Sequence, residues 1–239
     1  MYLKWKEITI TDFSEEHINS LYTQGYVFTR LGKGKMDQTR SARVDLSKFE
    51  LSSENRRILK KTDEIKLSAG ALPYLDYNWK IGKQAKDFYD TKFGDKTFSA
   101  NKIKELMTDD ANSNFNLVLT YCHCEEEQSD DEAIPDAEIA SSPSGAPRND
   151  IGYAICHTTD EILHYSYPFY DLKNSPKDMG LGMMTRAIVW AKKNGKKYVY
   201  LGSASRPSDT YKMQFAGFEW FDGSEWSNNL EALKNILNK

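Results

Sequence analysis

One segment near the C-terminus combines an aromatic strand, a glycine-rich turn, a helix and a second aromatic strand. Aromatic and other residues alternate over 162–170, as expected for a strand. The pattern DMGLGMM follows, then a helical stretch over 183–194 that Gly195 ends, and then a strand over 197–203. A strand that leads into a helix N-terminus presents backbone N–H groups to a ligand, which suits an anion or an acyl group. This order therefore favours acyl transfer over hydride or phosphoryl transfer.

The remaining sequence predicts a mixture of helices and strands. Helices are expected at 14–25, after Ser52 or Ser53, and at 80–93, 99–109, about 208–216 and the C-terminal end; strands are expected at 25–30, within 39–49, at 115–124 and at 151–157, with a loop at 33–37. The predicted class is α/β (α+β). The strand–turn–helix–strand segment resembles a GNAT-like acyltransferase domain (GCN5-related N-acetyltransferase architecture). We expect this domain over 69–239 and a small N-terminal domain over 1–68.

Composition narrows the class of protein. The chain has 239 residues, of which 39% are hydrophobic, enough for one large domain or two small ones. No stretch approaches the roughly 18 apolar residues of a membrane helix. The start MYLKWKEITITDF lacks the apolar region of a signal peptide, so we expect a cytoplasmic protein without a membrane partner. Three cysteines do not make a disulfide framework.

The segment 125–150 differs from the rest of the chain. It contains nine acidic residues and one basic residue, with almost no large apolar side chains. Such a stretch buries too little surface to offset its chain entropy, so we predict a disordered acidic insertion between two strands that pair as a hairpin. An acidic interaction segment is the alternative. Without it the chain has an excess of basic residues, which permits an anionic partner.

Two blocks of sequence resemble the arginyl-tRNA–protein transferase family. The first, over 22–61, has the family's order of basic and aromatic positions at Arg43, Val44, Phe49, Ser52, Ser53, Arg56, Arg57 and Lys60. The second has matching positions at Phe169, Tyr170, Asp171, Gly180, Ile188, Ala191, Tyr198, Tyr200, Leu201, Gly202, Lys212 and Met213. The family's N-terminal metal-binding cysteines are absent, because no cysteine precedes Cys122.

The resemblance implies a divergent bacterial-type N-end rule aminoacyltransferase. Such an enzyme moves an amino acid, arginine or leucine-like, from charged tRNA to the N-terminal amine of a protein and so creates an N-degron (protein arginylation in the arginine case). The expected partners are charged tRNA and protein or peptide N-termini. No cofactor is expected, because aminoacyl-tRNA is a co-substrate. Two alternatives remain: a GNAT N-acetyltransferase that uses acetyl-CoA, and a non-catalytic relative that binds tRNA or protein.

Two residues are the candidate catalytic groups. Asp171 follows a strand end, where its carboxylate could accept the amine proton or bind a positive group, and capping a turn is the alternative role. Tyr211 could donate a proton to the leaving ribose, although ordinary packing explains it equally well. Substrate-binding candidates are Tyr167, Phe169, Gly180, Gly182, Ser203 and Lys212.

Gly180 and Gly182 precede the predicted helix. They could form a backbone nest for a phosphate or a terminal ribose, or only a tight turn. In an acetyl-CoA enzyme this turn would hold the pyrophosphate, and Lys177 fits that signature only in part.

Basic and sulfur-containing residues give two further hypotheses. Arg43, Arg56, Arg57 and Lys60 could bind tRNA phosphates, the alternatives being a solvated helix face and an internal ion pair of Arg43 with Asp45 or Glu50. Cys122, Cys124, Cys156 and His157 allow a zinc site, but buried reduced cysteines explain them more simply, so no metal is expected.

Overall fold

The structure is a computed structural model that describes residues 3–123 and 150–238. The acidic insertion predicted over 125–150 therefore lies outside the described residues, apart from Asp150, which begins a strand. Within the described part of the chain, no helix is long and apolar enough to cross a bilayer.

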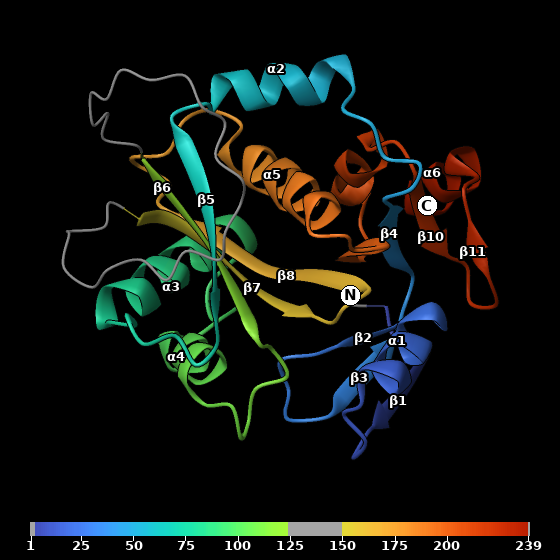
Figure 1. Ribbon diagram of the computed structural model, residues 1–239, viewed down its shortest axis with the longest axis horizontal. Coiled ribbons are helices and arrows are strands. Elements are labelled where there is room, and N and C mark those ends of the chain that lie inside the picture. Colours follow the sequence, from blue (N-terminus) through green and yellow to red (C-terminus); the bar gives the residue numbers. More distant parts are fainter. Residues whose placement is uncertain (1–2, 124–149, 239) are drawn as a thin grey trace.

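An eight-stranded sheet forms the centre of the molecule (Figure 1). Its strand order is β11-β10-β4-β9-β8-β7-β6-β5, and every neighbouring pair is antiparallel except β8 with β9. The strands are β4 (Ser41–Asp45), β5 (Ile65–Ala71), β6 (Leu117–His123), β7 (Asp150–Thr158), β8 (Ile162–Tyr170), β9 (Tyr198–Ser203), β10 (Phe218–Phe221) and β11 (Trp226–Ser227). The predicted mixed α/β class and the hairpin of β6 with β7 are confirmed.

A second, three-stranded sheet has the order β1-β3-β2. Its strands are β1 (Lys6–Thr9), β2 (Tyr26–Phe28) and β3 (Lys35–Gln38). The loop predicted over 33–37 is thus wrong for its second half, because Lys35 begins β3. The polar residues of β3 hid its strand character: Met36 packs into the core while Asp37 pairs in register with Val27 of β2.

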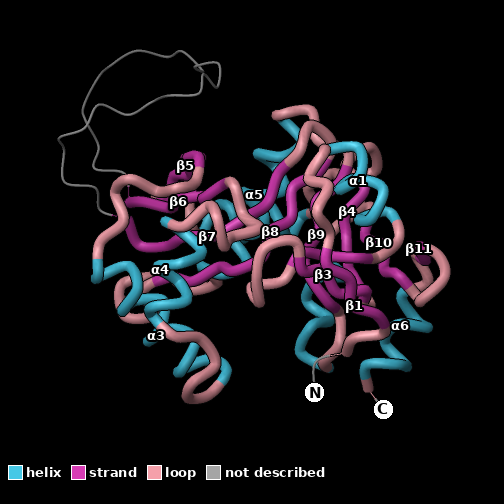
Figure 2. The backbone as a smooth tube through the Cα atoms, turned by 90° about the horizontal axis from the view of Figure 1, so that it is seen from below, coloured by secondary structure: helices cyan, strands magenta, loops and turns pink. Residues whose placement is uncertain are grey.

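Helices cover both faces of the large sheet (Figures 1 and 2). They are α1 (Glu15–Thr23), α2 (Ser53–Lys61), α3 (Trp79–Phe93), α4 (Ala100–Thr108), α5 (Met179–Lys193), the 3₁₀ helix η1 (Pro207–Gln214) and α6 (Leu230–Leu237). Ser52 caps α2 by accepting a hydrogen bond from the Asn55 amide, as its position predicted. Helix α5 begins at Met179, four residues before the predicted start.

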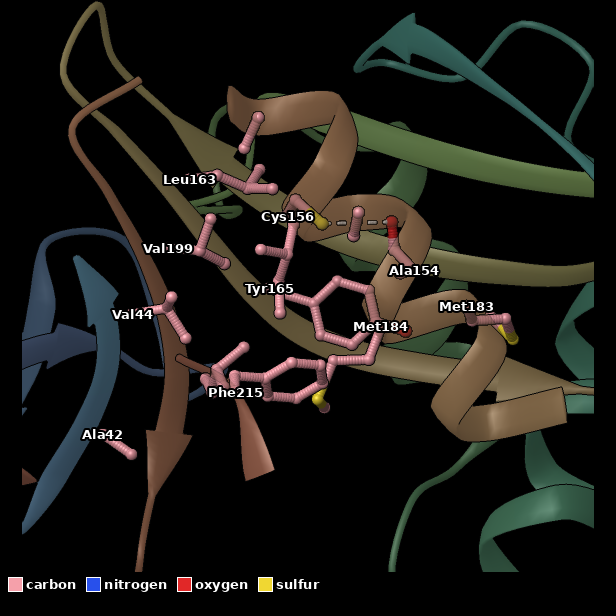
Figure 3. Packing of buried hydrophobic residues seen from close by; sticks show 14 of the residues in the cluster. Ala42, Val44, Ala154, Cys156, Leu163, Tyr165, Met183, Met184, Val199 and Phe215 are labelled. Carbon is pink, nitrogen blue, oxygen red and sulfur yellow. Dashed lines mark hydrogen bonds between the residues drawn. The ribbon is translucent and has the colours of Figure 1, made fainter. Parts of the chain in front are cut away.

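Alternation along the strands divides the core into two layers. In β7, Ala154 and Cys156 face α5, whereas Tyr153 and Ile155 face the layer that contains α1, α3 and α4. Figure 3 shows the α5 layer, where the ring of Tyr165 lies among aliphatic and methionine side chains. The sheet is therefore buried on both sides, which fixes its strand register.

Strand β4 ties the N-terminal part of the chain to the large sheet. It lies between β10 and β9, with Val44 opposite Val199 and Phe218. The division into domains at residue 68 stays a prediction, and β4 belongs by pairing to the same sheet as the strands of 69–239.

Two histidines are buried on the α1 side of the sheet. The Nδ1 atom of His164 is 2.8 Å from the Tyr22 hydroxyl, and Nδ1 of His157 donates to the Asn114 carbonyl at 2.7 Å. Burial lowers the pKa of His164 to about 3, and His157 and Lys212 nearby add to the effect. Burial likewise lowers the pKa of His157 to about 4. Both rings are therefore neutral at pH 7.

These histidines make stability depend on pH. In the unfolded chain a histidine has a pKa of about 6.5, so unfolding takes up protons as the pH falls from 7 to 5. We expect the free energy of unfolding to decrease there by up to about 1.4 kcal/mol per pH unit for each of the two histidines. In urea titrations, His164→Asn is expected to remove roughly half of this slope. An unchanged slope would contradict the neutral, buried state of His164.

Candidate functional site

The parallel pairing of β8 with β9 is short and stops before either strand ends. The last pair in register is His164 with Tyr200. Beyond it β8 continues to Tyr170 alongside β7, and β9 continues to Ser203 alongside β4. The facing edges therefore keep main-chain groups that they do not share with each other. Such groups can hold an acyl carbonyl at the end of a sheet.

The ammonium group of Lys212, a residue of η1, lies at the end of β9. Its Nζ donates to the Ser203 carbonyl at 2.7 Å and lies 3.8 Å from Oδ1 of Asp209, and the residue is only 6% exposed. Burial lowers the pKa of Lys212, although the Asp209 carboxylate works against this effect. Helix η1 thus turns a cation back toward the strand, where low water content strengthens its field.

Asp209 and three hydroxyls shape the segment after β9. Oδ2 of Asp209 accepts hydrogen bonds from the amides of Ser205 and Arg206, both at 2.9 Å. The Ser203 hydroxyl lies 2.9 Å from that of Thr39 and also bonds to that of Ser205. These contacts fix a polar surface around the Lys212 ammonium. Ser203 and Lys212, both predicted to bind substrate, are therefore brought together.

Tyr211 stands beside this polar surface. Its side chain is 44% exposed, and its ring centroid is 5.9 Å from Nζ of Lys212. Partial burial raises the pKa of Tyr211 to about 12, with a further contribution from Asp209. The hydroxyl therefore carries its proton at neutral pH, as a proton donor must.

The two aromatic candidates on β8 differ in accessibility. Phe169 is completely buried and stacks on Tyr153 with ring centroids 5.3 Å apart, so the structure places it in the core rather than at a surface. Tyr167 is only partly buried and packs edge-on against Phe98 and Phe115. Of the two, Tyr167 is the one that is partly exposed.

Asp171 has the contacts of a turn cap. Its Oδ1 accepts from the amide of Lys173 at 2.8 Å, and its Oδ2 accepts from the Asn174 side chain at 2.7 Å. Burial raises the pKa of Asp171, but these hydrogen bonds outweigh it and leave the pKa lowered. A carboxylate held in this way is a weak base, so the geometry favours the turn-capping role over proton transfer.

Gly180 and Gly182 lie inside the first turns of α5 and not in a turn before it. A Cβ on Gly182 would be 2.7 Å from Oγ1 of Thr62, because the Thr62 side chain packs directly against this part of the helix. A Cβ on Gly180 would meet the ring of Tyr170 at 3.3 Å. Close packing against neighbouring side chains therefore explains why these two positions are glycine. A phosphate-binding nest is not needed to explain them.

Acidic and basic side chains meet at the N-terminus of α5. Asp178 occupies the N-cap position with φ +69°, and its Oδ2 lies 3.2 Å from Nζ of Lys61 and 4.0 Å from Nη2 of Arg57. A carboxylate at this helix end occupies the region of positive potential that a pyrophosphate would use. The geometry therefore argues against the coenzyme A alternative at this turn.

Arg43 is held by contacts within the protein. Its guanidinium binds Oε2 of Glu219 through two nitrogens, at 2.9 and 2.8 Å, and lies over the rings of Tyr198 and Trp226 at 4.0 and 3.9 Å. The residue is 7% exposed. The predicted internal pair exists, but its partner is Glu219, whereas Asp45 pairs with Lys48.

The three basic candidates on α2 are not equivalent. Arg57 bonds to Glu54 in the same helix and lies near Asp178. Arg56 and Lys60 are exposed, and neither has an ion pair among the residues that the structure describes. These two cations are therefore available to an external anion.

The cysteine hypothesis finds no support within residues 3–123 and 150–238. No group of His, Cys, Asp and Glu side chains in these ranges is arranged to hold a metal ion. Cys156 is buried, which raises the pKa of its thiol, and Cys124 lies outside the described residues.

Asp209 and Arg206 escaped the sequence analysis. Loop residues after a strand are ambiguous, since a carboxylate there caps turns in most proteins. One signal could have identified Asp209. It is the third residue of a helical turn that begins at Pro207, and a carboxylate at that position often accepts hydrogen bonds from amides that precede the helix.

Comparison with known proteins gives relatives of one kind. No protein-family model matches the chain. An aspartate/glutamate leucyltransferase of Dinoroseobacter shibae is 26% identical over 224 residues, which are 90% of this chain and 73% of the relative. One from Stenotrophomonas maltophilia is 31% identical over 84 residues, 34% of each chain. This chain is similar to aspartate/glutamate leucyltransferases. The resemblance to aminoacyltransferases thus extends over most of the sequence.

Solved structures share the arrangement only distantly. L-PGS from Bacillus licheniformis covers 94% of this chain and 71% of its own, with a TM-score of 0.45 and 12% identity. A GCN5-related glucosamine N-acetyltransferase region of a fungal GH3 β-N-acetylglucosaminidase covers 90% of this chain and 23% of its own, with a TM-score of 0.47 and 8% identity.

Substitutions of the two glycines separate packing from phosphate binding. Thr62 cannot easily move, because its Oγ1 accepts a hydrogen bond from Arg186 at 2.6 Å. We expect Gly182→Ala to lower the free energy of unfolding by about 1–3 kcal/mol. Gly180→Ala is expected to change it by less than about 1 kcal/mol, because the partly exposed Tyr170 ring can shift and alanine favours a helix.

The measurement is urea unfolding of both variants at pH 7. A fully stable Gly182→Ala protein that has lost substrate binding would contradict the packing role and restore the phosphate nest.

Proposed function

We propose that this protein transfers an amino acid from aminoacyl-tRNA to the N-terminal amine of an acceptor protein. The donor amino acid is leucine, and the acceptors begin with aspartate or glutamate. The observation that carries the proposal is the similarity to an aspartate/glutamate leucyltransferase over 90% of the chain. The buried Lys212, the Ser203 segment and Tyr211 supply a polar site at the end of β9, which suits acyl transfer.

The reaction needs little acid–base assistance at the amine. A free α-amine has a pKa of about 7.7–8.0, so a useful fraction is neutral near pH 8 without a protein base. Its nitrogen attacks the ester carbonyl, a C–N bond forms, and the C–O bond to the terminal ribose breaks. The amine nitrogen loses one proton to water, and the ribose oxygen gains one. The step therefore depends mainly on positioning, oxyanion stabilisation and protonation of the leaving oxygen.

The site residues divide these tasks. Lys212 has N–H groups beyond the one given to the Ser203 carbonyl, and its charge stabilises negative charge on the carbonyl or ribose oxygen. Tyr211, protonated and half-exposed, donates to the leaving oxygen. Asp209 is a positioning residue. Its carboxylate accepts hydrogen bonds from the Ser205 and Arg206 amides and faces the Lys212 ammonium.

The test is transfer of radiolabelled leucine or arginine from charged tRNA onto peptides with varied first residues. A parallel reaction replaces tRNA with labelled acetyl-CoA. We expect leucine transfer to peptides that begin with Asp or Glu, abolished by RNase. Label from acetyl-CoA alone would show an acetyltransferase. Salt-dependent binding of tRNA without any transfer would show a non-catalytic relative.

Tyr211→Phe tests the proton donor. The Tyr211 hydroxyl makes no hydrogen bond with the described residues, so the variant should keep its stability while kcat falls by about 10²-fold or more. KM for charged tRNA should change little. The measurement is the single-turnover rate of amino-acid transfer at pH values from 7 to 9. A rate equal to wild type would remove Tyr211 from the mechanism.

Arg56→Gln combined with Lys60→Gln tests the tRNA-binding surface. Each lost phosphate contact should reduce the slope of log affinity against log salt by about 0.7–0.9, and affinity should fall for every tRNA alike. The matched control is Lys80→Gln with Lys104→Gln, two exposed lysines on α3 and α4, across the sheet from α2 (Figure 1). Equal losses in both double variants would show that α2 has no special role.

A further inference from the structure

Arg30 is a partly buried cation that lacks a counter-ion. Its guanidinium carbon lies 4.1 Å above the ring centroid of Phe98. Among the described residues no carboxylate lies within salt-bridge distance of it, and no hydrogen bond of its side chain is found. Arg43 is the internal comparison, because it also lies on aromatic rings but binds Glu219 with two nitrogens. Partly buried cations usually have such a partner, so Arg30 has the features of a receptor for an anion.

The loop that carries Arg30 is held rigidly. The Asn114 side chain donates to the carbonyls of Thr29 and Gly32, at 2.9 and 2.7 Å, and accepts from the Gly34 amide at 2.6 Å. Lys33, the nearest other cation in the loop, is used structurally, since its Nζ donates to the Ser113 carbonyl at 2.6 Å. The backbone that carries Arg30 is thus fixed before any ligand arrives, which limits the entropy lost on binding.

A row of contacting aromatic rings, of which Phe98 and Tyr89 are buried, extends from Arg30 to the segment after β9. Phe98 contacts Tyr89 with ring centroids 4.8 Å apart, Tyr89 contacts Phe93 at 5.8 Å, and the guanidinium carbon of Arg206 lies 5.4 Å from the Phe93 ring. Arg206 follows the serine loop that Asp209 and Lys212 organise. Tyr167, on the part of β8 beyond its pairing with β9, packs on Phe98 at 5.3 Å.

The environment of Arg30 suits one carboxylate better than a chain of phosphates. Burial raises the pKa of Tyr167 to about 12, and the nearby Arg30 opposes this rise while Asp37 adds to it. Both signs of charge therefore act near the Tyr167 hydroxyl. An N-terminal acidic residue presents one carboxylate together with an amine, whereas a nucleic-acid strand presents several phosphates. A planar guanidinium also matches the two oxygens of a carboxylate.

We propose that Arg30, which lies over Phe98 and near Tyr167, binds the side-chain carboxylate of the acceptor's first residue and so selects aspartate and glutamate. This inference rests on the proposed function and names the specificity-determining residue for it. The α-amine of the same residue then lies beside Tyr167, where β8 and β9 separate.

The experiment compares Arg30→Met with wild type on peptides that differ only in Asp or Asn at the first position. We expect wild type to prefer Asp, and the variant to lose this preference by on the order of 30-fold or more in kcat/KM, as for removal of one partner of a desolvated ion pair. Arg30→Lys should keep part of it. Lys35→Met, which removes a nearby cation that faces Glu7 on the surface, should keep it all.

Direct binding separates the possible failures. Fluorescence anisotropy of labelled Asp and Asn peptides measures the preference without turnover, and thermal unfolding checks that the variant is folded. A variant with the wild-type preference would overturn the assignment while leaving the proposed function intact. A loss of tRNA affinity that is equal for all peptides would also overturn it, because Arg30 would then bind phosphate. No transfer from any donor by wild type would instead reject the proposed function.

Discussion

The short parallel contact between β8 and β9 determines how the rest of the molecule is arranged. In an otherwise antiparallel sheet, this pair needs a crossover, and α5 provides it by packing Met184, Ala187 and Ile188 over the sheet. The pairing ends at His164 and Tyr200. The strand ends beyond that point are thereby separated, and η1 folds back to place Lys212 beside β9. Main-chain groups beyond that point are not shared between β8 and β9.

Much of the fold could be predicted because its local patterns agree with its tertiary structure. Strand β8 was predicted with its observed ends, and the helix predicted over 99–109 is observed as α4, which Ser99 caps. Strand β3 could not be recognised, because the polar residues Lys35, Asp37 and Gln38 are typical of a loop. They form a strand here because β1 and β2 pair with them on both sides. The start of α5 was placed too late because two glycines disfavour a helix locally. Only the contact with Thr62 explains why glycine is required there.

The candidate site was predictable in its residue types but not in its connections. Ser203, Lys212 and Tyr211 were identified from the sequence, and the structure brings them together. Asp171 and Arg43 looked equally functional, yet one caps a turn and the other is satisfied by Glu219, a partner 176 residues away in the chain. The sequence alone does not show whether a charged side chain pairs with another residue in the folded protein or is available to a ligand. Arg30 and Arg43 show this directly: both lie on aromatic rings, and only their distant neighbours differ.

We propose that the reacting end of the tRNA binds where β8 and β9 separate, and not at the N-terminus of α5. Hydrogen–deuterium exchange with a non-reactive, amide-linked leucyl analogue of the tRNA 3′ end tests it most directly. We expect slower exchange of amides in 165–170 and 201–214 on binding, with no change over 178–182. Protection confined to 178–182 would contradict it, because that pattern places the ligand at the helix end that Asp178 occupies.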